Sequence, residues 1–148
     1  MAQTTGITAE SSSPQATRAI GKSIAAKLGK GSVVSLRGPL GAGKTVLVKG
    51  IAEFFGIEEE ITSPTYTIVS EYRGNLDGSP IEFWHIDAYR LKGEDDFTAI
   101  GGEEYIYGSG ISVIEWSERI SGLLPAGAVM VEIEICGGDN RIIRVSGV

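Results

Sequence analysis

The sequence has one cysteine, Cys136, and one histidine, His85. A single cysteine excludes an internal disulfide and a metal site built on several cysteines. We interpret Cys136 as a small apolar residue of a strand. No apolar run approaches the roughly 20 residues that cross a membrane, and the first residues lack the charged and apolar segments of a secretory signal. These absences predict a cytoplasmic protein with no membrane contact.

Basic residues are also few, since 13 Lys and Arg stand against 19 Asp and Glu in 148 residues, for a net charge of −6. A protein that grips nucleic acid directly usually presents a basic face. Here the lysines and arginines are scattered along the chain. The charge therefore disfavours direct binding of RNA and is compatible with a protein partner.

The chain does contain a glycine-rich segment, residues 38–45, which fits the phosphate-loop pattern G-x-x-x-x-G-K-[ST] at every fixed position. An apolar run precedes it and a helical apolar pattern follows it, as a phosphate site requires. Its glycines let backbone N–H groups point inward, and the helix start adds the positive end of its dipole. Lys44 can reach the β- and γ-phosphates, and the Thr45 hydroxyl can bind Mg²⁺. The predicted nucleotide contacts here are Gly38, Leu40, Gly41, Ala42, Gly43, Lys44 and Thr45.

Two acidic residues, Asp87 and Glu115, each end an apolar run that we predict to be a strand. At the carboxyl edge of a sheet such acids lie beside the phosphate loop, where they can hold Mg²⁺ or orient an attacking water. The alternative is that each acid only makes a strand end more soluble. His85, between two apolar neighbours, is more typical of a packed structural histidine than of a catalytic one.

Thr65 follows Ser63 and Pro64, between the predicted phosphate-loop helix and the next strand. A switch loop that senses the γ-phosphate and its Mg²⁺ occupies this place in nucleotide switches. Ser-Pro is also ordinary turn chemistry, and the spacing leaves both interpretations open. Trp116 adjoins Glu115 and either stacks near the nucleotide or fills the core.

The predicted order is strand, helix, hairpin, strand, hairpin, which is not the regular alternation of a large α/β enzyme. We predict an α/β protein with a P-loop NTPase-like three-layer fold and a mixed parallel and antiparallel sheet. It forms a single domain over residues 1–148, of which residues 1–12 are flexible. Turn residues within 74–80 predict a hairpin with a long loop, and a short helix is expected within 95–107. Longer helices are predicted from Pro14 and after the phosphate loop, and strands over 33–36, 66–72, 81–87, 111–116, 129–135 and 141–145.

Several kinds of phosphate-loop protein compete for this outline. A GTPase would carry the motifs N-K-x-D and D-x-x-G, and neither occurs. A small-molecule kinase would usually carry an arginine-bearing lid, whereas the arginines here are dispersed. An ATPase whose hydrolysis changes the conformation of a partner suits the switch-like segment better. The kinase and a nucleotide-sensing binding module remain as alternatives.

Four blocks in this order make a specific resemblance: residues 38–45, Thr-Ser-Pro-Thr-Tyr-Thr at 62–67, His-Ile-Asp-Ala-Tyr-Arg-Leu at 85–91 and Ile-Glu-Trp-Ser-Glu-Arg at 114–119. Over about residues 13–125 the chain resembles the TsaE (formerly YjeE) family of small bacterial ATPases of tRNA threonylcarbamoyladenosine biosynthesis. The resemblance implies a weak, partner-stimulated, Mg²⁺-dependent ATPase that binds ATP and ADP. It implies the partners TsaB and TsaD, which transfer the threonylcarbamoyl group to adenosine 37 of tRNA.

The resemblance also implies residue roles. The catalytic set would be Lys44, Thr65, Asp87 and Glu115, with Thr65 as the switch threonine. The metal ligands would be Thr45, Asp87 and Glu115, and the further nucleotide contacts would be Trp116, Thr17 and Arg141, the last two at the base or ribose.

The chain departs from the family pattern at three places. Pro39 stands where Asp is common, Ser117 stands where Pro is frequent, and the hairpin around residues 75–80 looks lengthened. None of these changes touches the expected phosphate or metal contacts, so they bear on partner fit more than on ATP binding.

Overall fold

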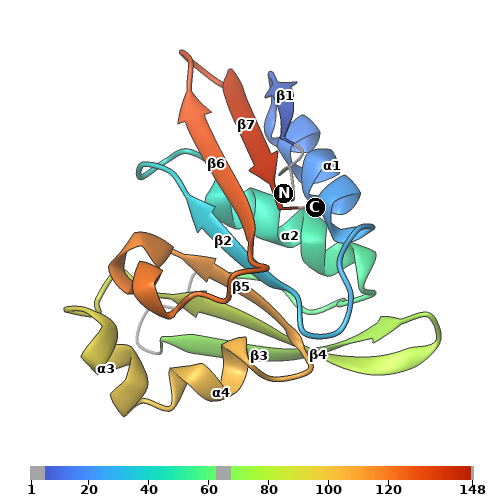
Figure 1. The fold of residues 1–148 in the computed structure, drawn as a ribbon. Helices are drawn as coiled ribbons and strands as arrows, with labels where there is room; N and C mark the ends of the chain where they lie inside the picture. The colour runs from blue at the N-terminus through green and yellow to red at the C-terminus, as the bar shows by residue number, and fades with distance from the viewer. Residues whose placement is uncertain (1–5, 63–67, 148) are drawn as a thin grey trace.

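A computed structural model describes residues 6–62 and 68–147, and its core is one mixed sheet (Figure 1). In this described part the sheet has the strand order β1-β7-β6-β2-β5-β4-β3. The elements in chain order are β1 (Ile7–Ser11), α1 (Pro14–Ala25), β2 (Val33–Arg37), α2 (Lys44–Phe54), β3 (Val69–Leu76), β4 (Ser79–Asp87), α3 (Glu94–Ala99), α4 (Gly102–Ile106), β5 (Ile111–Glu115), the 3₁₀ helix η1 (Ser117–Leu123), β6 (Val129–Ile135) and β7 (Arg141–Ser146).

The centre of the sheet is parallel and its two sides are antiparallel, which confirms the predicted mixed sheet. Strand β2 pairs in parallel with β5 and β6, and β5 pairs in parallel with β4. Strands β3, β7 and β1 are added antiparallel to this centre. All five residues of β5 are buried, as expected for a parallel strand covered on both faces.

Helices cover both faces of the sheet centre, so the fold has three layers. On one face, α1 and α2 pack against Val34, Leu36 and Val113. On the other face, Ile86 and Ile114 pack against Phe97 of α3 and residues of α4 and η1. Figure 1 shows α1 and α2 side by side, away from α3 and α4.

Local signals explain where α1 begins. The Ser13 hydroxyl accepts a hydrogen bond from the Ala16 amide at 3.0 Å, and Pro14 occupies the first turn. Ile24 of α1 and Leu28 just beyond its end are buried in the core.

The prediction that residues 1–12 are flexible is wrong for residues 7–11. This segment forms β1, which pairs antiparallel with β7 in the register Ile7 to Val145. Its own pattern is weak, and the strand forms because an edge of the sheet offers backbone partners from the distant end of the chain.

The predicted long hairpin loop is also wrong, because the turn between β3 and β4 is only Asp77–Gly78. Both residues have positive φ, 51° and 84°, which suits the tight turn that favours Asp-Gly. Gly74 is therefore a strand residue, and it is small because a Cβ there would lie 2.6 Å from the Phe55 carbonyl oxygen.

Three smaller expectations need correction. Cys136 lies just beyond β6 and is exposed, so it is not an apolar strand residue. The helix expected within 95–107 is two short helices, separated at Gly101, whose φ is 76°. The strand expected to reach Trp116 ends one residue earlier, and η1 follows where no helix was predicted.

Candidate functional site

The segment between β2 and α2 has the backbone of a phosphate loop. Gly41 and Gly43 have φ of 78° and 100°, a region that residues with a Cβ rarely adopt. Lys44 and Thr45 then open α2. The first N–H groups of a helix lack intrahelical partners and favour an anion, so this turn is built to receive phosphate.

A cleft of about 430 Å³ opens in front of this loop. The loop, the ends of β4 and β5 and the segments that follow these two strands all contribute to it. Its lining is Leu40, Gly41, Ala42, Gly43, Lys44, Thr45, Val46, Asp87, Tyr89, Glu115 and Trp116. Sequence reasoning found every lining residue except Val46 and Tyr89. Tyr89 lies within the block 85–91, which carried part of the family resemblance, so that block held a signal for it.

Lys44 is held inside this cleft by two contacts. Its Nζ donates a hydrogen bond to the Gly38 carbonyl at 2.7 Å and lies 3.7 Å from the centroid of the Trp116 ring. Burial lowers the pKa of Lys44, while the nearby Glu115 carboxylate acts in the opposite direction. The ammonium therefore sits in a partly desolvated place where attraction to a phosphate is strong.

The two strand-end acids lie side by side, and both line the phosphate-loop cleft. Asp87 and Glu115 are paired in the β4–β5 register. One Asp87 carboxylate oxygen, Oδ1, accepts a hydrogen bond from the Tyr89 amide at 2.9 Å. Glu115 is 4% exposed, and its Oε2 lies 2.5 Å from Nε2 of His85. His85 is thus buried, as expected of a packed histidine, and its hydrogen-bond partner is a predicted site residue.

The donors in this cleft suit Mg²⁺ better than a transition metal. Mg²⁺ takes one or two carboxylates together with hydroxyl and phosphate oxygens. Asp87, Glu115 and Thr45 supply such oxygens to the lining of the cleft. In residues 6–62 and 68–147 no group of three or more His, Cys, Asp or Glu side chains could hold a metal by itself, so nucleotide oxygens would have to complete the coordination.

Trp116 takes a backbone conformation that the sequence did not reveal. Its φ of 60° is one of two positive values found at non-glycine residues of the described chain. This turn directs the chain from β5 into η1 and sets the indole over Lys44 and 5.0 Å from the Tyr89 ring. Trp116 therefore lines the phosphate-loop cleft and also packs, partly buried, against the core.

Arg141 and Thr17 lie around the phosphate loop. Arg141 donates from Nε to the Ala42 carbonyl at 2.9 Å and from Nη2 to the Gly41 carbonyl at 3.1 Å. It also lines a neighbouring cleft of about 510 Å³. Thr17 is 3% exposed, and its hydroxyl is hydrogen-bonded to that of Ser11 at 2.8 Å. A contact of either residue with a base or ribose stays a prediction, and Thr65 lies outside the described residues.

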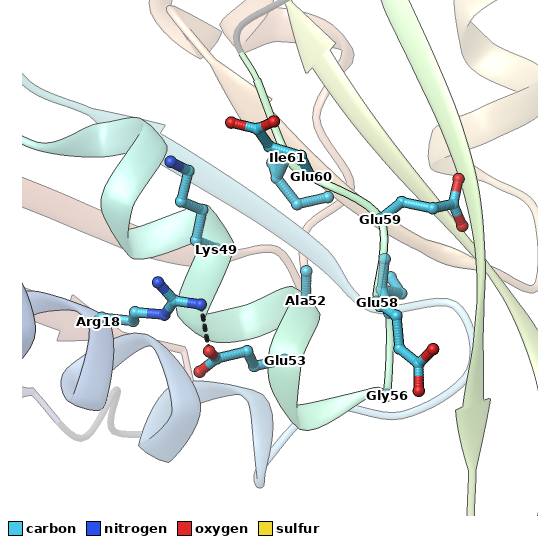
Figure 2. Close-up of a pocket in the computed structure, with 10 residues that line it drawn as sticks. Arg18, Lys49, Ala52, Glu53, Gly56, Glu58, Glu59, Glu60 and Ile61 are labelled. Carbon is cyan, nitrogen blue, oxygen red and sulfur yellow. Dashed lines mark hydrogen bonds and ion pairs between the residues drawn. The ribbon is translucent and has the colours of Figure 1, made fainter.

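A larger cleft, of about 610 Å³, lies elsewhere and has the wrong chemistry for a nucleotide (Figure 2). It is bounded by α1, α2 and the segment after α2. Arg18 forms an ion pair with Glu53 there, so this guanidinium is already neutralised. The segment contributes three consecutive glutamates, residues 58–60. Without a glycine loop or a helix N-terminus this acidic surface would repel a triphosphate, so its chemistry suits a nucleotide less well than that of the phosphate-loop cleft does.

Comparisons with known proteins bear on the family. The family model "Threonylcarbamoyl adenosine biosynthesis protein TsaE" matches residues 11–143. The chain belongs to the TsaE family. A tRNA threonylcarbamoyladenosine biosynthesis protein TsaE of Treponema pallidum is 44% identical over 136 residues, which are 92% of this chain and 97% of that protein. The TsaE protein of Bacillus subtilis is 38% identical over 135 residues, 91% of this chain and 82% of that protein.

A solved structure agrees with this membership. The crystal structure of Bacillus subtilis YdiB matches with a TM-score of 0.75 and 34% identity, over 99% of this chain and 88% of that one. The predicted resemblance to TsaE and the predicted α/β P-loop fold are therefore confirmed, and a P-loop fold of this family implies a nucleotide site. None of these relatives is named as a kinase, so the kinase alternative has no support. In the described chain, every helix is too short or too polar to span a bilayer.

Proposed function

We propose that this TsaE-family chain is a weak Mg²⁺-dependent ATPase that supports formation of threonylcarbamoyladenosine at position 37 of tRNA. The observation that carries this proposal is the cleft in which the phosphate loop faces two adjacent strand-end acids. The pathway comes from the printed names of the relatives, which are threonylcarbamoyladenosine biosynthesis proteins.

The residues divide the work in the following way. The loop amides and Lys44 bind the β- and γ-phosphates of ATP, and ADP after hydrolysis, with Trp116 beside them. Thr45, Asp87 and Glu115 hold Mg²⁺, which when bound neutralises charge on the phosphate oxygens. Asp87 also orients the attacking water, and Thr65 senses the γ-phosphate. The assignments of Lys44, Thr45, Asp87, Glu115 and Trp116 agree with their shared cleft and with the oxygen chemistry of its acids, and the assignment of Thr65 rests on the family resemblance alone.

The base and ribose have a natural place next to this cleft. Arg141 lies between the two clefts. It donates hydrogen bonds to phosphate-loop carbonyls, and it lines the neighbouring cleft together with Asn140 and Ser11. Thr17 lies just behind, with its methyl carbon 3.9 Å from where a Cβ of Gly43 would stand. We propose that the base and ribose occupy the neighbouring cleft.

The protein is proposed to act with TsaB and TsaD and to bind tRNA itself weakly or not at all. The net charge of −6 supports a protein partner over a nucleic-acid surface. Work on tRNA in bacteria would place the protein in the cytoplasm.

Reconstitution tests the proposal. TsaB, TsaD and an enzyme that makes the activated threonylcarbamoyl donor are mixed with tRNA and ATP, and modified adenosine is counted over many turnovers. Adding this protein should raise the yield, and adding the Lys44→Ala variant should not. No increase with cognate partners would contradict the proposed role. Tight ATP binding without partner-stimulated phosphate release would instead favour a nucleotide-sensing module.

A further inference from the structure

His85 is a buried polar side chain with an unusual position. It lies on β4 two residues before Asp87 and is 0% exposed. In the β4–β5 register His85 is opposite Val113, and Asp87 is opposite Glu115. The imidazole therefore reaches Glu115 diagonally, from the interior of the sheet, and its Nε2 lies 2.5 Å from Oε2 of that carboxylate. For Glu115 to bind a cation its carboxylate must be ionised and can only accept, so in that state the ring donates its Nε2–H.

A histidine is a costly choice for this place if its only task is packing. Its neighbours Phe83 on β4 and Val113 on β5 are fully buried. Its other ring nitrogen, Nδ1, is buried with no hydrogen-bond partner in the described part of the chain. A buried polar atom without a partner is unfavourable, and an apolar side chain would avoid that cost. The bond to Glu115 is the contact that an apolar residue could not provide.

In each of the two strand-end acids, one carboxylate oxygen has a hydrogen-bond partner. The Tyr89 amide holds Oδ1 of Asp87, and His85 holds Oε2 of Glu115. In the described chain no hydrogen bond is found at the second oxygen of either carboxylate, so each of these oxygens can meet a cation. Partners that fix a ligating carboxylate in this way commonly change metal affinity by about 10- to 100-fold when they are removed.

We propose that His85 is a positioning residue that fixes Glu115 so that its Oε1 meets Mg²⁺ in the phosphate-loop cleft. This inference rests on the proposed function, because it takes Glu115 as a ligand of Mg²⁺ there. His85 itself does not touch the metal or the nucleotide.

Two amide variants of matched chemistry test the proposal. The amide nitrogen of Gln reaches about as far as Nε2 of His, whereas that of Asn reaches only as far as Nδ1. Mn²⁺ replaces Mg²⁺ and is titrated by electron paramagnetic resonance against the protein with a non-hydrolysable ATP analogue. His85→Asn should weaken Mn²⁺ binding by about 10- to 100-fold, and His85→Gln should recover most of it. Metal-free binding of the analogue should stay unchanged in both.

Ser112→Ala is the control for damage to the core. Ser112 is fully buried on β5, and its hydroxyl bonds the Tyr105 carbonyl, away from Glu115. This variant should keep the Mn²⁺ affinity of the unmodified protein. If His85→Asn also keeps it, or if His85→Gln is as weak as His85→Asn, the positioning role is wrong.

The unmodified protein offers a second test that does not depend on how the variants fold. Because His85 is the only histidine, its ring nitrogens give one set of nuclear magnetic resonance signals. Adding Mg²⁺ to the complex with the analogue should shift the Nε2 signal, since its carboxylate partner gains a cation. No shift would overturn the proposal.

Glu115→Gln separates this inference from its premise. If Glu115→Gln binds Mn²⁺ as well as the unmodified protein, the magnesium assignment fails and this inference fails with it. If Glu115→Gln binds weakly while His85→Asn binds normally, only the role of His85 is wrong.

Discussion

The parallel centre of the sheet and its antiparallel side around β7 differ in burial and in what they give to the site. Strands β2 and β5 of the centre are almost wholly buried, whereas β7 on the antiparallel side is buried only at Ile143 and Val145. The centre ends in the phosphate loop and the two acids. The antiparallel side reaches the loop through the guanidinium of Arg141, from outside the cleft. We infer that the parallel centre supplies the residues of the site and that the antiparallel side stabilises the phosphate loop through Arg141.

The largest effect is expected at the centre, from Lys44→Ala. Removing the ammonium takes away a preorganised charge for the phosphates, so ATP turnover should fall by about 10²- to 10³-fold. Fluorescent-nucleotide titration and phosphate release measure binding and turnover. Lys49→Ala is the matched control, because Lys49 is on the same helix but lines the larger acidic cleft. A greater loss in Lys49→Ala would move the nucleotide to that cleft.

Two isoleucines compare the regions directly. Ile114 on β5 and Ile143 on β7 are both 0% exposed. Each Ile→Ala change should lower the free energy of unfolding by about 2–5 kcal/mol, as measured in urea. Only Ile114→Ala should also weaken ATP binding, because Ile114 directly precedes Glu115. Equal losses of ATP binding in the two variants would contradict the proposal that the parallel centre alone forms the site.

The pH dependence of ATP binding sharpens the role of the centre. Burial lowers the pKa of Lys44, so its ammonium is lost at a lower pH than that of an ordinary lysine. Above this pKa, ATP affinity should fall by up to about tenfold per pH unit. The free energy of unfolding should instead rise with pH between the pKa of Lys44 in the folded chain and its higher pKa in the unfolded chain. In that range the unfolded chain binds more protons than the folded one. Lys44→Arg should have a flat profile, since Arg stays charged.

The smallest of these effects is expected on the antiparallel side. Arg141→Ala removes charged hydrogen bonds to the Gly41 and Ala42 carbonyls, and ATP affinity should fall by about tenfold. Arg144→Ala is the control on the same strand. Its ion pair with Glu134 is half exposed, so its loss should leave binding unchanged. Normal ATP affinity in the Arg141→Ala variant would show that the phosphate loop does not depend on these hydrogen bonds.

Features that depend on residues close together in the sequence could be predicted from it. The phosphate loop is a contiguous motif, and Asp87 and Glu115 each follow a short apolar run, so their meeting at one edge follows from parallel pairing. The Trp116 turn and the strand β1 escaped prediction, because each depends on partners elsewhere: Lys44 and Tyr89 surround Trp116, and β7 pairs with β1. The short turn at Asp77–Gly78 does have a local signal, which was missed because Gly74 was taken as part of the turn, whereas Gly74 is a strand residue packed against Phe55. His85 looked structural because nothing local shows that Glu115 is its neighbour.

A crystal structure of this protein with Mg²⁺ and a non-hydrolysable ATP analogue tests the central claim most directly. We predict the triphosphate on the backbone amides of residues 41–45 and the metal between the Thr45 hydroxyl and the carboxylates of Asp87 and Glu115. Phosphates bound in the larger cleft beside Arg18, or both carboxylates turned away from the metal, would contradict the account.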